Sequence, residues 1–521
     1  MEEKFIIAHD LGTTNNKAAL VRLDTEVVGR TISSYEVSYP HPGYAEQSPE
    51  DWWNAIIKTT RELLETTDIP PAQIAGIVFS AQMACTLPVD SDGEALTPAM
   101  IWLDARASSQ AEDILGGPIK VEEYNVFSLI RFLRITGGGP GHAGKDPISK
   151  ILWIKENEPR IYEKTHKFLG TQDYLIYRCT GNFMTGRDNA NVSWLMDTRP
   201  GKFCWSDALL KRYGIEERKL PKIMKSTDVA GKLTSRASYE LGLWKGLPLV
   251  VGAGDMASAA IGSGAVKENH IHACIGTSDW LACHVSKRKK DIRHYVGAIC
   301  GADPEMYLCV AEQESAGVCL DWIKNQMYHR EEVREEEKVE ELYQLFDRMV
   351  KDANPGASNL IFTPWLYGER APIDDHSVRG GFHNLGLNHS REDLLRAVFE
   401  GVAFNMRWAL IHLEKLTQRA EFINIIGGGA KSDIWCQIIS DVLDRRINQV
   451  HQPQEAGCRG AAMIAAVGLG YLDDFSKVEE MVKIKNTFIP NAKNRRLYDD
   501  LFDEFRNIYT KNKDIYARLN V

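Results

Sequence analysis

Asp10 and the turn Gly12-Thr13-Thr14 that follows it are the first residues with types and spacing suited to chemistry. A glycine lets the backbone approach a phosphate, and successive N–H groups in a tight turn form an anion nest. The threonines add hydroxyl donors, and Lys17 adds a positive charge. Asp10 can hold Mg²⁺ partly through water, because this ion keeps several of its waters. Alone, such a pattern is more often an ordinary hairpin turn.

A second turn of this kind, Gly276-Thr277-Ser278, follows the apolar residues 271–275. We expect strands over residues 5–8, 17–23 and 27–37 around the first turn, and over 271–275 and 280–285 around the second. The repeat predicts an internal duplication with two turns facing one polyphosphate. The predicted domains are residues 1–250 and 251–521. Chance recurrence of a short Gly-Thr turn is the alternative.

Asp255 ends the segment Gly252–Asp255, between a predicted strand over 247–251 and a helix of small residues. Ligands of α/β proteins bind where strands end. The local sequence alone favours a plainer interpretation, in which this Asp only caps the helix.

The turn Gly427–Ser432 lies between a predicted strand, 423–426, and a predicted helix, 433–443. Such a turn suits a nucleotide, which needs close backbone approach. It lacks the GxGxxG pattern, so a dinucleotide fold is poorly supported.

Residues 139–145, GPGHAGK, match the letters of a P-loop but not its context. A P-loop needs Ser or Thr after the lysine to hold Mg²⁺, and Asp146 stands there instead. Pro147 follows, and residues 131–136 make a poor core strand. We expect a flexible, glycine-rich surface loop over 137–145 that folds over a ligand.

Length and composition narrow the class of protein. The chain has 521 residues, of which 44% are hydrophobic and 26% charged, and its net charge is −9. This predicts two large globular domains and argues against a nucleic-acid binder. The most apolar stretch, 247–266, is interrupted by Asp255, so we expect no membrane partner. Ten scattered cysteines without a CxxC pair, and a start without a signal peptide, predict a reduced, cytoplasmic protein.

Taken together, the motifs resemble the FGGY carbohydrate kinases of the actin/hexokinase-like superfamily, with the xylulokinase-like branch nearest. The two Gly-Thr turns and Gly252–Asp255 are similar to the phosphate motifs and the catalytic segment of this family. Further similar segments occur in the expected order: 150–157, 367–372, 380–400 (with Asn384 at a usual Gly), 427–432 and 455–460. Each motif is modest, but the ordered set spans most of the chain and is specific.

The resemblance implies an α/β protein with two ribonuclease-H-like domains and an active-site cleft between them. It implies ATP and Mg²⁺ as cofactors, a small sugar or polyol as substrate, and a possible homodimer. Asp255 would be the catalytic base, and Asp10 with Asp255 would hold Mg²⁺, partly through water. The implied phosphate and nucleotide contacts are Gly12, Thr13, Thr14, Lys17, Gly276, Thr277, Ser278, Gly317, Gly428, Gly429 and Ser432.

The implied substrate contacts depart from the family pattern. They are Gln82, Met83, Ala84, Trp102, Asp104, Arg106, Asp255 and Met256. Ala84 stands where xylulokinases have a sugar-contacting His, and Met256 stands where many members have Gln or Asn. Two polar contacts are therefore missing, and we expect an acceptor other than plain D-xylulose. It would carry an apolar or deoxy edge, or a larger group that uses the space beside Ala84.

Two other function classes stay open. A non-catalytic or regulatory sugar-binding protein of this fold would lack the catalytic set, whereas Asp10, Asp255 and both turns are present. A P-loop or chaperone-type ATPase would hydrolyse ATP without a sugar, and no peptide-binding β-domain is evident after the ATPase portion.

Overall fold

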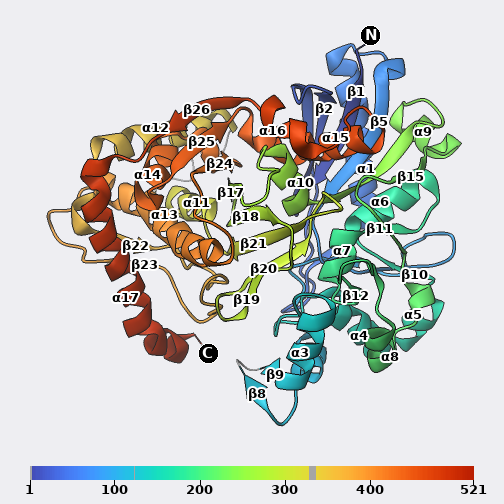
Figure 1. Cartoon of the computed structure of the whole chain (residues 1–521), viewed down its shortest axis with the longest axis horizontal. Coiled ribbons are helices and arrows are strands. Elements are labelled where there is room, and N and C mark those ends of the chain that lie inside the picture. The colour runs from blue at the N-terminus through green and yellow to red at the C-terminus, as the bar shows by residue number, and fades with distance from the viewer. Residues whose placement is uncertain (1–2, 122–123, 328–335, 521) are drawn as a thin grey trace.

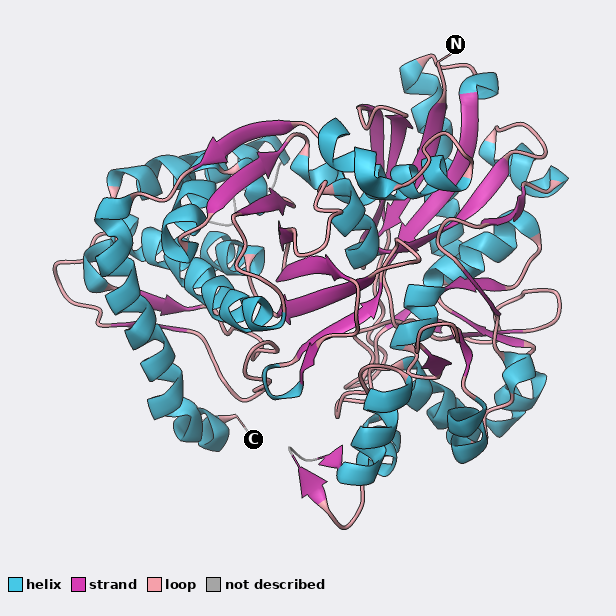
Figure 2. Ribbon diagram, in the orientation of Figure 1, coloured by secondary structure: helices cyan, strands magenta, loops and turns pink. Residues whose placement is uncertain are grey.

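A computed structural model describes residues 3–121, 124–327 and 336–520 and shows two large sheets side by side (Figures 1 and 2). The first sheet has the order β15-β16-β5-β1-β2-β3. Its strands are β1 (Phe5–Leu11), β2 (Asn15–Arg22), β3 (Val27–Ser34), β5 (Ile74–Ala81), β15 (Val229–Lys232) and β16 (Pro248–Gly254). The opening β1-β2-β3 meander is confirmed, and β5 and β16 add to it in parallel.

The second sheet has the order β19-β20-β21-β18-β17-β24-β25-β26. Its strands are β17 (Ile271–Ile275), β18 (Asp279–Val285), β19 (Lys290–Asp291), β20 (Val296–Cys300), β21 (Tyr307–Gln313), β24 (Phe422–Ile426), β25 (Arg446–Val450) and β26 (Ile484–Phe488). Strands β21, β18 and β17 form an antiparallel meander, and β24 and β25 follow in parallel. The first sheet repeats this pattern in β3-β2-β1-β5-β16, which supports the duplication. The boundary at residue 250 stays a prediction, since β16 extends through Gly254.

Helices cover both faces of each sheet. The first sheet packs on one face against α1 (Pro49–Thr67), α6 (Thr171–Thr180) and α9 (Ser235–Leu241). On its other face lie α10 (Asp255–Gly262) and α15 (Ala456–Gly468), which share one apolar core with residues of the second sheet. The far face of the second sheet carries α11 (Gly317–Met327), α12 (Glu336–Asp352), α13 (Arg391–Leu416), α14 (Asp433–Leu443) and α17 (Arg495–Leu519).

Smaller elements complete the first half. They include α2 (Ser108–Leu115), α3 (Val126–Ile135), α4 (Pro147–Asn157), α5 (Pro159–Lys164), α7 (Arg187–Val192) and α8 (Asp207–Tyr213). Paired short strands there are β4 (Glu46–Gln47) with β7 (Ala99–Met100), and β6 (Leu87–Val89) with β10 (Lys167–Leu169). A third pair is β11 (Met184–Gly186) with β14 (Lys222–Met224).

The charge-rich helix α12 begins at Glu336, the first described residue after residue 327. Residues 247–266 contain β16, α10 and the short loops on either side, and they do not form a membrane span. No helix in the described part of the chain is long and apolar enough to cross a bilayer.

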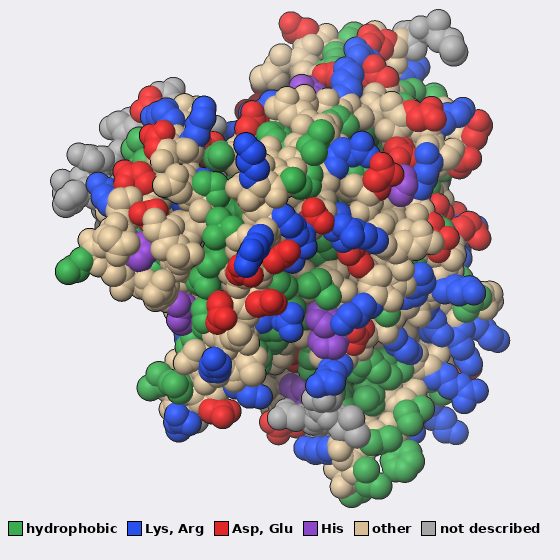
Figure 3. Space-filling view, turned by 60° about the vertical axis from the view of Figure 1, so that its left-hand side comes forward, with side chains coloured by type: hydrophobic (Ala, Val, Ile, Leu, Met, Phe, Trp, Pro, Cys, Tyr) green, Lys and Arg blue, Asp and Glu red, His purple; other side chains and the backbone are tan. Residues whose placement is uncertain are grey.

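The cysteines are all free. Nine of the ten are buried, and Cys204 is exposed. On the face shown in Figure 3, basic and acidic side chains are largely interspersed.

The glycine-rich segment 137–145 joins α3 to α4, so no strand precedes it and the rejection of a P-loop is supported. It is more tightly packed than the surface loop we expected. Gly137 and Gly144 are buried with φ of +86° and +69°. A Cβ at Gly144 would lie 2.3 Å from the backbone carbon of Ala107. Asp146 holds the segment by accepting hydrogen bonds from the Gly141 amide and the Trp194 indole.

Helices α10 and α15 cross through glycines, and this contact joins the two halves (Figure 1). A Cβ on Gly460 would lie 1.7 Å from the Ser258 carbonyl oxygen, and one on Gly262 would lie 1.8 Å from the Ala456 oxygen. Real Cβ atoms do not approach backbone so closely, so both positions exclude any side chain. The small residues therefore set the distance between the helices.

We expect Gly460→Ala to destabilise the protein by about 1–3 kcal/mol or more, because the added methyl meets rigid backbone rather than a movable side chain. Denaturant unfolding would measure the change. Gly297→Ala in β20 is the control, since no atom lies within 4 Å of a Cβ there. Equal stability of the Gly460→Ala and Gly297→Ala proteins would contradict the proposed glycine contact.

Candidate functional site

The first turn is fixed by its carbonyl groups. Gly12 and Asn15 accept hydrogen bonds from the Tyr35 hydroxyl at 2.6 and 3.1 Å, and Thr13 accepts one from the Gln47 amide at 2.6 Å. Within the described residues, the amides of Thr13 and Thr14 have no acceptor in the protein. The turn therefore directs carbonyls inward and leaves N–H groups for an anion, as a nest does.

The second turn is built in the same way. The Thr277 carbonyl accepts from the amides of Ala316 and Val318, and the Gly276 carbonyl accepts from Gly317 at the start of α11. A Cβ on Gly317 would lie 2.4 Å from the Gly276 oxygen, so this glycine permits the contact. The predicted residues Gly276, Thr277, Ser278 and Gly317 are thus brought together.

The turn after β24 packs on the same strand end. A Cβ on Gly429 would lie 2.4 Å from the Ile275 side chain, and one on Gly427, whose φ is +93°, would lie 2.4 Å from the Ile275 oxygen. Gly428 and Gly429 therefore lie beside the second turn. Ser432 begins α14 and accepts a hydrogen bond from the Trp435 amide, while its hydroxyl donates to Asp347 at 2.6 Å.

Asp10 and Lys17 face each other across the β1–β2 hairpin as Cα partners. The Ser80 hydroxyl donates to Asp10 Oδ1 at 3.1 Å. A Cβ on Gly457 of α15 would lie 2.4 Å from Asp10 Oδ2, so the second half of the chain contributes to this site. Burial raises the pKa of Asp10, while Lys17 and Ser80 act in the opposite direction.

Asp255 begins α10 directly after β16, and an irregularity in the β5–β16 pairing sets its position. The register shifts between Val250 and Ala253, where Gly252 has φ +78°. The Gln172 amide bridges the gap by donating to the carbonyls of Phe79 and Val251, both at 2.7 Å. Asp188 then accepts the Gly254 amide at 2.5 Å. The sequence did not reveal the roles of Gln172 and Asp188, because their hydrogen bonds join segments that are far apart in the chain.

The Asp255 carboxyl is partly buried and accepts the Met256 amide at 2.8 Å. Burial raises its pKa to about 7, and the charge of Asp10 adds to the rise. The two carboxylates are therefore near enough to repel each other, although they are distant in sequence. Such a pair suits a divalent cation or a proton acceptor poised near neutral pH.

Asp279, directly after the second turn, is a further residue that sequence reasoning missed. It is 1% exposed, and in the described part of the chain neither of its side-chain oxygens has a hydrogen-bond partner. Burial, with the nearby Glu369 carboxylate, raises its pKa well above the usual range. Burial thus disfavours the charged form of this acid next to the turn.

Gln82, Met83 and Ala84 follow β5 and reach the region of Asp255. A Cβ on Gly254 would lie 2.5 Å from the Met83 sulfur, so Met83 covers the end of β16. Ala84 has φ +56°, and its carbonyl accepts from the buried Lys150 ammonium at 2.9 Å. Gln82 donates through its side-chain amide to the Gln47 side chain at 2.8 Å.

A cavity of about 40 Å³ lies beside Ala84 and is also lined by Gln82, Thr86, Asp173 and Asn189. Gln82 Oε1 and Thr86 Oγ1 are buried there with no hydrogen-bond partner among the described residues. Burial raises the pKa of Asp173 to about 7. The space beside Ala84 is therefore lined mostly by apolar residues, with a few polar groups among them.

Trp102, Asp104 and Arg106 connect this region to the first turn. The Trp102 indole donates to the Thr13 hydroxyl at 2.9 Å. Asp104 is fully buried and pairs with Arg106 at 2.7 Å, and Arg106 also contacts Glu46 at 2.6 Å. The Arg106 guanidinium lies 3.6 Å from the Tyr44 ring centroid. These side chains hold one another; their predicted contact with substrate stays a prediction.

Comparison with known proteins finds both domains of one family along the chain, in the order that the sequence motifs indicate. Residues 5–262 match the N-terminal domain model of the FGGY family of carbohydrate kinases, and residues 272–469 match its C-terminal domain model. A xylulose kinase of Bacillus subtilis (strain 168) is 30% identical over 519 residues, which cover 99% of each chain. A gluconate kinase and a ligand-bound xylulose kinase from Lactobacillus acidophilus both superpose with TM-score 0.87 at 28% identity, covering 99% of this chain and 100% of theirs.

The duplicated α/β fold, with a Gly-Thr turn after the first strand of each half, has the actin/hexokinase-like architecture of a class of phosphotransferases. The matched models span most of the chain, and the predicted family is confirmed: the chain belongs to the FGGY family of carbohydrate kinases and is an ATP-dependent sugar kinase.

Proposed function

We propose that the protein transfers the γ-phosphoryl group of ATP to a hydroxyl of a small sugar, ketose or polyol, in an active site between the two halves. The observation that carries this proposal is that Asp10 and Asp255 lie at the ends of β1 and β16, on either side of β5, beside Lys17 and the first turn, and that the charge of Asp10 raises the pKa of Asp255. The activity is xylulokinase-like, but the acceptor is not plain D-xylulose. Phosphoryl transfer needs positioned phosphates, compensated charge and a base for the attacking hydroxyl.

The amides of Thr13, Thr14, Thr277 and Ser278, with the Lys17 ammonium, bind the phosphates. The pair Asp10 and Asp255 fits Mg²⁺, because the mutual repulsion of the buried carboxylates is relieved by a positive charge. Mg²⁺, when bound, would offset charge on the phosphates. Gly317, Gly428, Gly429 and Ser432 contact the adenosine end of the nucleotide, supported by their clustering around Ile275 and Gly276.

Asp255 accepts the proton of the attacking hydroxyl. Asp188 and Gln172 hold the strand end from which this carboxylate projects, so they are positioning residues. A raised pKa suits a general base, because it keeps the carboxylate basic enough to take a proton near neutral pH.

The cavity beside Ala84 has room for the larger-group version of the acceptor. Its volume of about 40 Å³ has room for roughly two or three waters. Gln82 Oε1 and Thr86 Oγ1 lack partners there, so a hydroxyl entering the cavity gains hydrogen bonds that an apolar group would not. An acceptor with an additional hydroxyl-bearing group fits this chemistry.

A non-catalytic sugar-binding role is the second candidate function. Its supporting observation is the loss of polar character at Ala84 and Met256. The retained Asp10, Asp255 and Lys17 favour catalysis. Sugar binding without ADP release in a broad acceptor screen would support the alternative, whereas ATP hydrolysis without any sugar would indicate another ATPase class.

We expect Asp255→Asn to lower kcat by about 10²- to 10⁴-fold, the range that general acid–base catalysis contributes. ATP binding, measured by calorimetry, should survive. Asp207→Asn is the matched control, because Asp207 is also the first residue of a helix, α8, and is exposed. Near-normal turnover of Asp255→Asn would remove Asp255 from the base role.

The pH dependence follows from the raised pKa of Asp255, about 7 in the protein. Because only the deprotonated carboxylate accepts a proton, kcat/KM with both substrates subsaturating should rise with pH through about 7 and level off above it. Removing the Asp10 charge in Asp10→Asn should shift this rise to lower pH. A profile that is flat between pH 5.5 and about 8 would contradict the assignment.

We expect D-xylulose to be a poor acceptor in a screen of keto-pentoses, polyols, deoxy sugars and sugar acids for ADP release. Ala84→His should lower kcat/KM for the preferred acceptor by about fivefold or more, because the ring fills the cavity and a lost hydrogen bond is worth about 1 kcal/mol or more. Exposed Ala95→His is the control. Fast, selective turnover of D-xylulose by the unaltered protein would refute this acceptor class.

A further inference from the structure

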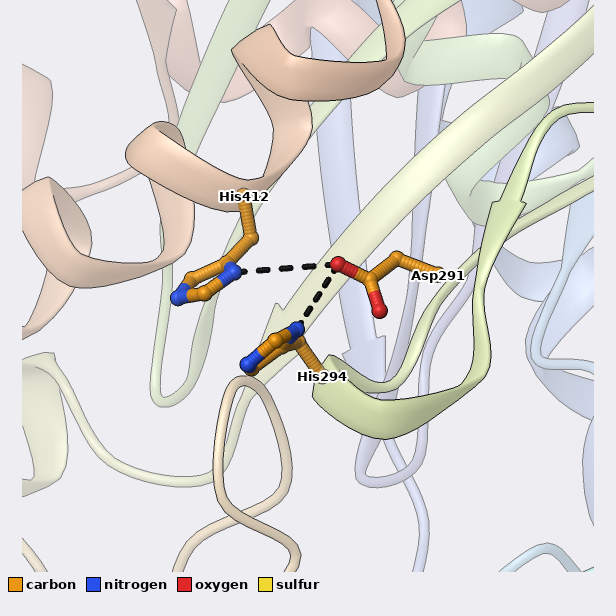
Figure 4. A group of neighbouring side chains, drawn as sticks. All are labelled: Asp291, His294 and His412. Atoms are coloured by element: carbon orange, nitrogen blue, oxygen red, sulfur yellow. Dashed lines mark hydrogen bonds and ion pairs between the residues drawn. The ribbon is translucent and has the colours of Figure 1, made fainter.

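Three side chains with metal-binding atoms meet away from the phosphate turns. Asp291 ends β19, His294 belongs to the short helix η3 (Ile292–His294), and His412 lies near the end of α13. Asp291 Oδ2 lies 2.7 Å from His294 Nδ1 and 3.7 Å from His412 Nδ1. Figure 4 shows both nitrogens turned toward this one oxygen. The three ligand atoms lie within 4.8 Å of one another.

The imidazole rings of His294 and His412 stack with their centroids 3.6 Å apart. Both Nδ1 atoms lie on the side of the carboxylate, and the stacked rings must tilt apart for both lone pairs to point at one ion. His412 is 7% exposed, and its Nδ1 has no hydrogen-bond partner among the described residues, since 3.7 Å is too long for one. A buried polar nitrogen of this kind is unfavourable unless something binds it.

The donor set points to the class of ion. Two imidazole nitrogens and one carboxylate are typical ligands of Zn²⁺, whereas Mg²⁺ prefers oxygen ligands and water. Zinc–ligand bonds near 2.0 Å in a tetrahedral site imply about 3.3 Å between ligand atoms. The 3.7 Å separation is already near this value, and the 2.7 Å pair must open slightly.

Positively charged side chains near Asp291, His294 and His412 limit the affinity of this cluster for a cation. Lys415 lies one turn beyond His412 in α13 and acts against a bound cation. The Lys290 ammonium is held away by its bond to the Leu133 carbonyl, at 3.2 Å. His294 and Asp291 keep partly exposed side chains, so the site is open to an entering ion and to a water ligand.

We propose that His294 Nδ1, His412 Nδ1 and the Asp291 carboxylate bind one Zn²⁺ ion, with water completing the coordination. The site would fasten the β18–β20 connection to α13. Arg288, in the same connection, donates to the Ile135 carbonyl at 3.0 Å and the Thr198 hydroxyl at 2.9 Å in the first half. The ion would thus brace a segment that contacts both halves, without belonging to the phosphate site.

Calorimetric titration with ZnCl₂ tests this site in full-length, tag-free, chelator-treated protein without nucleotide, because ATP itself binds Zn²⁺. We expect one Zn²⁺ per chain, undisplaced by excess Mg²⁺. His294→Ala and His412→Ala should each weaken binding at least about tenfold, since even residues behind metal ligands matter by this factor. Zn²⁺ should raise the melting temperature of the unaltered protein but not of these variants.

His376→Ala is the control, since His376 lies 3.9 Å from Asp374 in a His–Asp contact and should leave Zn²⁺ binding unchanged. Circular dichroism of the metal-free proteins checks folding, and Asp291→Asn replaces any variant that fails this check. Unchanged stoichiometric binding in the variants would overturn the proposal. So would the absence of Zn²⁺ binding by the folded unaltered protein.

Discussion

The contact between α10 and α15 is the constraint on which the site depends. Gly262 and Gly460 allow the two helices to meet backbone to backbone. Helix α10 begins with Asp255, and Gly457 of α15 lies against the Asp10 carboxylate. One close packing therefore holds α15, from the second half of the chain, against two acids of the first sheet, Asp10 on β1 and Asp255 after β16. A side chain at Gly262 or Gly460 would push α15 away from α10 and from the Asp10 carboxylate.

The net charge of −9 does not oppose the binding of a polyanion, because the local arrangement of dipoles decides the potential. Tyr35 and Gln47 hold the carbonyls of the first turn, which leaves its amides for phosphate. The second turn achieves the same through the start of α11. An ionised Asp279 would make the electrostatic potential at the second turn more negative, but burial beside Glu369 favours the neutral form of this acid.

Local patterns in the sequence were sufficient for the hairpins, since apolar runs flank each Gly-Thr turn and the two strands pair through neighbouring residues. Helix α14 was also predicted with its observed bounds. The parallel pairing of β5 with β16 was not readable, because these strands are far apart in the chain. The bulge at Gly252 and its support by Gln172 depend on that pairing. Ala84 was recognised only by resemblance, and the cavity beside it could not be predicted because segments far apart in the chain line it.

The raised pKa of Asp255 links base strength to the presence of substrates. Burial and the charge of Asp10 keep the carboxyl partly protonated near neutral pH. When positive charge enters beside Asp10, the repulsion between the acids falls, and Asp255 loses its proton more readily. On the proposed assignment, Asp255 is therefore deprotonated, and able to accept a proton, in the same complex that holds the phosphates.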